Sequence, residues 1–251
     1  MDLTDTTTIV LTLAILAFAG GVHGVLGVGF PMIATLLIAM LSDVRTAMIL
    51  LLVPTMCNNI VNIVKGGHWE ASILKYWPLA AYGAVGSMIG TLLLMITDPA
   101  PYKLFLAAVI LLYLNVDRFG MRMAWVRQKP ALAFAVFGLA GGILAGTVNV
   151  MLPALVIFAL ELELAPTAMV QTFNFCFLFG KASQAVVFAG SGVFTLETLV
   201  ATLPLAGVAV GAGLIGMAVR DRVDAETYWG WLRLVLYGMS VMLVGQFFYS
   251  R

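Results

Sequence analysis

Long runs without a single charged residue constrain this chain more than any other feature. No Asp, Glu, Lys or Arg occurs in five runs, which are residues 6–42, 46–64, 76–97, 131–160 and 198–219. A helix that crosses the hydrocarbon core of a bilayer needs about 20 mostly apolar residues, and each run is near or above that length. Three more apolar stretches carry few charges, namely residues 102–116, 166–189 and 228–248. The sequence therefore predicts about eight hydrophobic segments in a lipid bilayer.

The composition agrees with a membrane protein and excludes several other classes. Hydrophobic residues make up 62% of the chain and charged residues 10%, with a formal net charge of +1. Soluble domains average about 45–50% apolar and about 25% charged residues. A soluble enzyme, a disordered chain and a nucleic-acid-binding protein are therefore excluded. Since the short alternating strands of a membrane barrel are also missing, we expect an all-α polytopic membrane protein.

The second half of the chain repeats the order of glycines and prolines in the first half. Three pairs of residues share an offset of 122 positions, namely Gly20/Gly142, Gly24/Gly146 and Pro31/Pro153. We therefore predict two membrane repeats of four segments each, residues 1–117 and residues 130–251, joined by a basic cytoplasmic linker at residues 118–129. Parallel and inverted repeats both remain open, because the first segment of each repeat either crosses the bilayer or re-enters it.

The first segment of each repeat is too long for one crossing and contains helix-breaking residues. As one helix, the first segment would measure about 50 Å, against a hydrocarbon core of about 30 Å. Because glycine and proline lower the cost of leaving a helix, we expect two half-helices in each segment, the second beginning near Pro31 and near Pro153. Helix starts favour anions, and matching breaks are typical of transporter binding sites. We assign Gly27, Gly29 and Gly146 to that site, with helix packing as the alternative.

Two polar side chains lie at the predicted breaks. His23 precedes Pro31 in the first break, and Asn149 precedes Pro153 in the second. His23 is a candidate for contact with the substrate or a proton, with a hydrogen-bonded structural histidine as the alternative. Asn149 is a candidate for contact with the ligand, with capping of the backbone as the alternative.

Polar residues also follow one face of the second segment and one face of the sixth. The candidates are Asn58, Asn59 and Asn62 in the second segment, and Asn174, Lys181 and Gln184 in the sixth. Their helical spacing places each set on one side of its helix. At the offset of 122 positions, Asn59 corresponds to Lys181 and Asn62 to Gln184. We therefore expect both faces to line a shared cavity.

Lys181 is the residue with the sharpest functional implication. A lysine near the centre of a membrane helix costs about 2.5–3.5 kcal/mol, and such residues usually mark a substrate or ion path. No Asp or Glu lies at a comparable depth in another segment. We therefore expect a bound anion to offset the charge. The alternatives are a side chain that extends to the membrane surface and a structural carboxylate as partner.

Orientation follows from the basic residues in the short loops. The linker at residues 118–129 is the richest in Lys and Arg and is placed in the cytoplasm. The loop between Lys65 and Lys75 is cytoplasmic by the same rule. The acidic loop at Glu161 and Glu163 is then expected outside. If all eight segments cross, both termini lie inside.

Neither catalysis nor a metal centre is predicted. The chain has two His residues, no His-Glu-x-x-His motif and no buried acidic pair. A nucleophile–base pair and a set of metal ligands are both missing from this pattern. We expect no catalytic residue, no metal site, no cofactor and no enzyme activity.

Together these motifs resemble the TauE/SafE sulfite exporter family over nearly the whole chain. The motifs are the glycine-rich residues 20–31, Asn58-Asn59, Gly66-Gly67 before Trp69, residues 146–153 and Phe179-Gly180-Lys181. The resemblance implies a multi-pass carrier of the bacterial inner membrane. Its substrate would be a small sulfur-containing anion such as sulfite or an organosulfonate, moved outward. An anion channel and an uptake carrier for another small organic anion are the alternatives, and a proton or sodium ion is an open choice of coupling ion.

Overall fold

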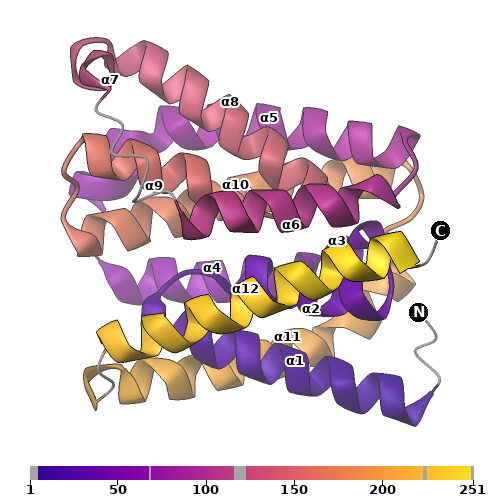
Figure 1. Cartoon of the computed structure of the whole chain (residues 1–251). Coiled ribbons are helices and arrows are strands. Elements are labelled where there is room, and N and C mark those ends of the chain that lie inside the picture. Colours follow the sequence, from indigo (N-terminus) through magenta and orange to yellow (C-terminus); the bar gives the residue numbers. More distant parts are fainter. Residues whose placement is uncertain (1–4, 68, 116–122, 223–224, 250–251) are drawn as a thin grey trace.

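The computed structural model describes residues 5–67, 69–115, 123–222 and 225–249, and all regular elements in these ranges are helical. The first half contains α1 (Thr6–Leu26), α2 (Phe30–Leu41), α3 (Val44–Leu50), α4 (Leu52–Gly66), the π-helical turn η1 (Glu70–Leu74), α5 (Lys75–Ile96) and α6 (Pro101–Leu114). The second half contains α7 (Ala124–Gln128), α8 (Pro130–Val148), α9 (Leu152–Glu161), α10 (Pro166–Gly190), α11 (Leu196–Val219), the 3-10 turn η3 (Arg220–Arg222) and α12 (Ala225–Tyr249). The helices lie roughly side by side (Figure 1).

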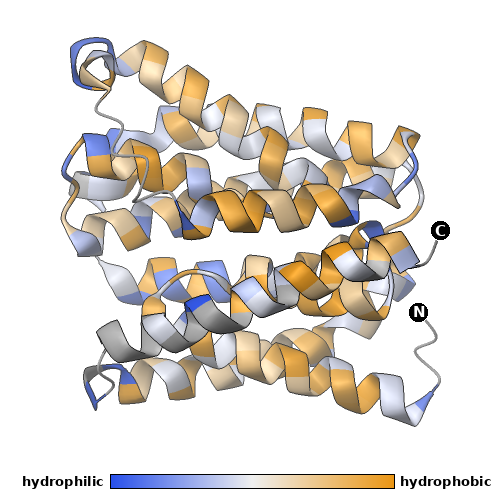
Figure 2. Cartoon of the chain, viewed as in Figure 1, coloured by the Kyte–Doolittle hydropathy of each residue, from blue (hydrophilic) through white to orange (hydrophobic). Residues whose placement is uncertain are grey.

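The helices have the length and polarity of membrane spans. Within the described ranges, five helices are long and apolar enough to cross a membrane, namely α1, Ser72–Ile96, α8, α10 and α11. The bent pair α3 and α4 makes a sixth if it is counted as one span. Hydrophobic residues cover the lengths of the helices, and hydrophilic residues gather near their ends (Figure 2). The predicted all-α polytopic membrane fold is confirmed.

The first segment of each half is broken where the sequence predicts. α1 ends at Gly27, whose φ of 78° is left-handed, and α2 begins after Gly29, whose φ is 104°. These angles favour glycine because it has no Cβ. α8 ends at Asn149, which has a φ of 63°. The second helices, α2 and α9, each begin one residue before a proline, Pro31 or Pro153.

The second segment has a bend that the sequence analysis did not predict. α3 and α4 meet at Leu51 at an angle of 51°. Pro54 lies in the first turn of α4 and has no N–H to donate to the carbonyl of Leu50. Its ring also crowds that carbonyl, which is the usual cause of a sharp kink. The corresponding segment of the second half, α10, is continuous.

The broken segment of the second half folds back on itself. The ring of Phe158, near the end of α9, lies 5.8 Å from Phe137 and 5.9 Å from Phe134, near the start of α8. Arg127 before α8 also lies 2.5 Å from Glu163 after α9. The expectation that the basic linker and the acidic loop lie on opposite sides is therefore wrong. It assumed that this segment crosses, whereas α8 and α9 form a hairpin.

The corresponding helices of the two halves, α4 and α10, run in opposite directions. Near one end of the pair, Gln171 Nε2 donates to the carbonyl oxygen of Ile63 at 2.9 Å. Farther along, Thr55 and Lys181 line one cavity. Residue numbers therefore fall along α4 while they rise along α10. Of the two arrangements left open by the sequence, this geometry is that of inverted halves.

The two ends of the helical bundle differ in charge. One end, called here the basic face, carries Lys65 at the end of α4, and Arg127 and Lys129 beside the start of α8. The termini lie at the other end, away from α7 (Figure 1). The expectation that both termini share the side of the basic linker applied only if all eight segments cross, and the hairpin of α8 and α9 does not meet that condition. Residues 118–122 of the linker, with Arg118 and Arg122, lie outside the described ranges.

Glycines join the two halves by allowing close backbone contact. α1 packs on α11, where a Cβ on Gly24 would overlap the carbonyl oxygen of Gly213. α5 packs on α8, where a Cβ on Gly142 would overlap the carbonyl oxygen of Gly83. Each first helix thus packs against a helix of the other half. The packing alternative holds for Gly20 and Gly24 in α1 and for Gly142 and Gly146 in α8.

Replacing a packing glycine should destabilise the bundle. We expect Gly24→Ala to lower the free energy of unfolding by about 1–3 kcal/mol, since the added methyl group meets backbone that cannot move alone. Thermal unfolding of the purified protein in detergent measures the change. Gly21→Ala is the matched control, because nothing lies within 4 Å of its Cβ position. An equal loss in both variants would contradict the packing role of Gly24.

The fold-back of α8 and α9 predicts which loops share a side of the membrane. We expect cysteines introduced at Arg127 and Glu163, after replacement of Cys57 and Cys176 by alanine, to react with an impermeant maleimide from the same side. A cysteine at Asp98, beyond the far end of α5, should react from the opposite side. Labelling of intact cells and inside-out vesicles gives the comparison. Labelling of positions 127 and 163 from opposite sides would contradict the hairpin.

Candidate functional site

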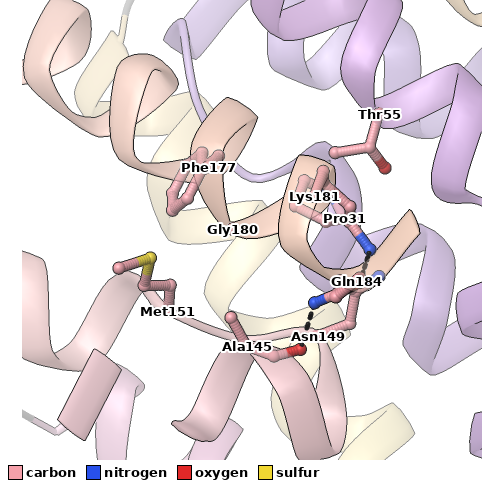
Figure 3. A pocket seen from close by; sticks show the side chains of 9 residues that line it. All are labelled: Pro31, Thr55, Ala145, Asn149, Met151, Phe177, Gly180, Lys181 and Gln184. Atoms are coloured by element: carbon pink, nitrogen blue, oxygen red, sulfur yellow. Dashed lines mark hydrogen bonds between the residues drawn. The ribbon is translucent and has the colours of Figure 1, made fainter. Parts of the chain in front are cut away.

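A small cavity lies between the two broken segments. It has a volume of about 10 Å³, about the room for one water molecule. Its lining consists of Pro31, Thr55, Ala145, Asn149, Met151, Phe177, Gly180, Lys181 and Gln184. These residues come from α2, α4, α8, α10 and the second break (Figure 3). The fold therefore brings both breaks and the charged residue of α10 to one point.

Lys181 supplies the positive charge of this cavity. Its side chain is buried, and its Nζ donates to Gln184 Oε1 at 2.7 Å. Gln184 is held in turn, because its Nε2 donates to the carbonyl oxygen of Ala145 at 2.9 Å (Figure 3). The same Nε2 also donates to Ser87 Oγ at 3.1 Å. No salt bridge joins Lys181 to a carboxylate of the described residues. The ammonium group is therefore oriented by a neutral amide and has no counter-charge in that part of the chain.

Thr55 is a cavity residue that belongs to the polar face of the second segment but is not among the site residues predicted from the sequence. Its side chain is fully buried, and its Oγ1 has no hydrogen-bond partner among the described residues. It lines the cavity together with Lys181 (Figure 3). A signal was present in the sequence, because Thr55 lies four residues before Asn59 on the same helical face. The hydroxyl group adds a neutral hydrogen-bond donor beside the ammonium group.

Asn149 caps the backbone at the end of α8, which is one of the two roles considered for it, and its contact with a ligand remains a prediction. Its left-handed backbone ends α8, as the corresponding Gly27 ends α1. Next to glycine in frequency, asparagine is the residue type that most often adopts this conformation at a helix end. Its side-chain Nδ2 donates to Thr35 Oγ1 on α2 at 2.7 Å. Asn149 therefore ties the second break to the helix that follows the first break, and it also lines the cavity.

His23 lies in a second polar cluster, at the first break. The ring is fully buried, with Nε2 at 2.6 Å from Asn62 Nδ2 and Nδ1 at 3.4 Å from the backbone N–H of Phe30. Since a neutral imidazole has one donor and one acceptor nitrogen, its tautomer decides which contact is a hydrogen bond. His23 therefore faces the first N–H of α2, a group that the sequence analysis reserved for an anion. It does not line the cavity of Lys181.

The two polar clusters follow the same internal offset. His23 corresponds to Ala145 and Asn62 to Gln184, each 122 positions apart. Asn62 contacts the side chain of His23, and Gln184 donates to the carbonyl oxygen of Ala145. In both halves, a side-chain amide of the second segment thus contacts the last turn before the break. In the first half the contacted group is the side chain of His23, and in the second half it is the backbone carbonyl group of Ala145.

The remaining candidates lie along α4 and α10. Asn58 donates to the carbonyl oxygen of Pro54 at 3.2 Å, and Asn174 donates to that of Gly27 at 2.8 Å. Asn59 is fully buried, and neither its Nδ2 nor its Oδ1 has a hydrogen-bond partner in the described residues. Burying an unpaired amide typically costs several kcal/mol. Such a group points to a ligand, a water molecule or a second conformation as its partner.

The candidate glycines have different places. Gly27 and Gly29 form the first break, but neither lines the cavity of Lys181. Gly146 lies inside α8, where a Cβ would overlap the carbonyl oxygen of Ser87 on α5. The structure therefore brings Lys181, Gln184 and Asn149 together in one cavity. It places His23 and Asn62 beside the first break, with Asn174 bonded to that break, whereas Asn58 bonds within α4.

Metal binding finds no support in the described residues. No three or more His, Cys, Asp or Glu side chains of those residues gather as a metal site. The polar groups at the cavity are an ammonium, a hydroxyl and amides. Ammonium and hydroxyl N–H and O–H groups suit an anion, whereas cations prefer carboxylate or carbonyl oxygens.

The chain matches one protein-family model. The model is described as "Sulfite exporter TauE/SafE" and matches residues 12–247. The match includes both broken segments, α4, α10 and the cavity between them. No match is found among curated protein sequences, and none among solved structures.

The unpaired amide of Asn59 gives a test that separates function from stability. We expect Asn59→Leu to leave the free energy of unfolding unchanged or to raise it by about 1–3 kcal/mol, because it removes a buried unpaired group. Anion transport should fall at the same time. Thermal unfolding and flux into proteoliposomes measure the two effects.

Asn62→Leu is the matched control for this pair of measurements. Asn62 lies one turn along α4, but its amide donates to the carbonyl oxygen of Asn58 at 3.0 Å. Its loss should lower the unfolding temperature. If Asn59→Leu destabilised the protein as much as Asn62→Leu, Asn59 would have structural partners and no place in the transport path.

Proposed function

The chain belongs to the TauE/SafE sulfite exporter family, and from this premise we propose that it exports a small sulfur-containing anion, such as sulfite or an organosulfonate. It does so as a secondary carrier of the bacterial inner membrane. The binding site is the cavity that Lys181 shares with both breaks. The proposal extends the family assignment, which concerns anion export across a membrane, to a named class of substrate and a named site.

The observation that carries this proposal is a buried ammonium group without a counter-charge in the described residues. Lys181 is 3% exposed, and the partner of its Nζ is the neutral side chain of Gln184. Removing a charge from water costs far more than one hydrogen bond returns. An anion in the cavity offsets that cost by direct charge attraction. The free energy that burial of the Lys181 charge costs is therefore offset when the anion binds, and this favours binding of the substrate.

The helix starts at the two breaks add to the positive potential. Pro31, in the first turn of α2, and Met151, directly before α9, both line the cavity. The first N–H groups of a helix point outward and carry a partial positive charge. α2 has 12 residues and α9 has 10, so each carries a helix dipole. Two helix starts and one ammonium suit a small anion of charge −1 or −2.

The size of the cavity favours a carrier over a channel. A volume of about 10 Å³ is too small for a sulfite or sulfonate ion together with a continuous water column. Binding therefore requires the helices around the cavity to move apart. Gly27 and Gly29 are suited to be the hinge, because their left-handed backbone angles have few steric restrictions. A carrier works through such alternating movements, whereas a channel needs an open path.

We also propose an orientation and a relation between the halves. The basic face is cytoplasmic, because short cytoplasmic loops are rich in Lys and Arg. The membrane repeats, residues 1–117 and 130–251, are inverted copies joined by the linker at residues 118–129. The opposite directions of α4 and α10 and the matched contacts of Asn62 and Gln184 support this relation. Inverted repeats with sites at broken helices are a common plan of secondary transporters.

Lys181 provides the direct test of the proposed site. We expect Lys181→Ala to abolish uptake of sulfite or sulfoacetate into inside-out proteoliposomes, with expression and unfolding temperature close to those of the original protein. Lys181→Arg should retain part of the activity, because it keeps the charge but changes its geometry. Radiolabelled substrate and thermal unfolding provide the two measurements.

Two further measurements complete the test of Lys181. Lys75→Ala is the matched control, since Lys75 is exposed on the basic face and should leave transport unchanged. In the original protein, the transported anion should raise the unfolding temperature by mass action, and Lys181→Ala should lose that shift. Full transport by Lys181→Ala would remove Lys181 from the binding site.

A further inference from the structure

A second and larger cavity lies towards the basic face. It has a volume of about 290 Å³ and is lined by side chains of α6, α9, α10 and α12 and by the residues around the first break. Most of its lining is aliphatic or aromatic, including Leu26, Val28, Leu152 and Phe173. Two arginines, Arg220 and Arg233, are part of the same lining. We call this space the arginine cavity.

Residues that line the arginine cavity lie next to residues that line the cavity of Lys181 at three places. Val28 lies three residues before Pro31, and Leu152 directly follows Met151. Phe173 lines the arginine cavity and Phe177 the cavity of Lys181, with their ring centroids 6.4 Å apart. Residues that line the two spaces are therefore neighbours in both breaks and along α10, and they form the layer between the spaces. Both broken segments contribute to that layer.

The chemistry of the arginine cavity suits an anion. A guanidinium group offers a planar set of N–H donors that matches the oxygens of a sulfonate or sulfite. Apolar walls reduce screening by water, so the charges of Arg220 and Arg233 act over a longer distance inside the cavity. An anion with a small apolar body fits such a lining better than a fully hydrated ion.

We infer that the arginine cavity is the cytoplasmic vestibule of the transporter, in which Arg220 and Arg233 hold the transported anion before it reaches Lys181. The inference rests on the proposed function, since it names the first binding site on the same path. The layer that includes Phe173 and Phe177 is the inner gate. The transported anion is favoured over a lipid headgroup as occupant, because the deep wall of the cavity reaches both broken segments, where a transport path must lead.

Thiol labelling tests the vestibule without any measurement of transport. Val156 lines the arginine cavity and is partly exposed, so Val156→Cys, with Cys57 and Cys176 replaced by alanine, places one thiol there. Methanethiosulfonate reagents that carry a sulfonate or a trimethylammonium group differ mainly in charge. We expect the anionic reagent to react faster from the basic face. Arg220→Gln with Arg233→Gln should lower its rate relative to the cationic reagent by about three- to tenfold.

Arg222→Gln is the matched control for the arginine variants. Arg222 belongs to the same turn as Arg220 and is exposed like it, but it does not line the cavity. Its replacement should leave the ratio of labelling rates unchanged. An equal change in the control would show a general surface effect and overturn the inference. So would slower labelling by both reagents when phosphatidylglycerol is added to neutral lipid, because the occupant would then be a lipid headgroup.

Transport kinetics separate the vestibule from the proposed function. If the original protein moves sulfite or sulfoacetate, the double arginine variant should raise KM for flux from the basic face by about three- to tenfold, with the maximal rate retained. A lower maximal rate at unchanged KM would overturn the vestibule and leave the central site intact. If the original protein moves neither anion, the proposed function fails, and the labelling ratio still decides whether the arginine cavity attracts anions.

Discussion

The structure depends on one constraint: backbone groups freed by a broken helix must find partners inside the protein when the surroundings are apolar. The first break is stabilised by Asn174, which donates to the carbonyl oxygen of Gly27, and by His23, which faces the N–H of Phe30. The second is stabilised by Gln184, which donates to the carbonyl oxygen of Ala145. Polar residues of α4, α10 and α1 therefore stabilise the two breaks, independently of any role in binding a substrate. The helices are broken at positions where these side chains supply hydrogen-bond partners to the backbone.

The same arrangement makes the two halves dependent on each other. α1 packs on α11 through Gly24, and α5 packs on α8 through Gly142, with backbone atoms in close contact in both places. In a bilayer, helix association depends on such close packing because water provides no hydrophobic drive between helices. Neither broken segment is therefore supported by its own half alone. In the proposed carrier, a movement of one half relative to the other would therefore change both breaks together.

Not every polar group in the centre has a structural partner. Asn174 and Gln184 are bonded, whereas Asn59 and the hydroxyl of Thr55 are buried without a hydrogen-bond partner in the described residues. Lys181 is bonded but has no counter-charge there. Groups of this kind lower stability. Thr55 and Lys181 line one cavity, and this position separates them from the residues that hold the breaks.

The sequence by itself determined the eight hydrophobic segments, the two breaks near Pro31 and Pro153, and the polar faces of α4 and α10. These features depend on residues within a few turns of one another. The hairpin of α8 and α9, the contact of Asn149 with Thr35 and the cavity shared by Thr55 and Lys181 were decided by the tertiary structure. The physical reason is distance along the chain: Asn149 and Thr35 are 114 residues apart, and periodicity shows which side of a helix is polar but not which helix it faces.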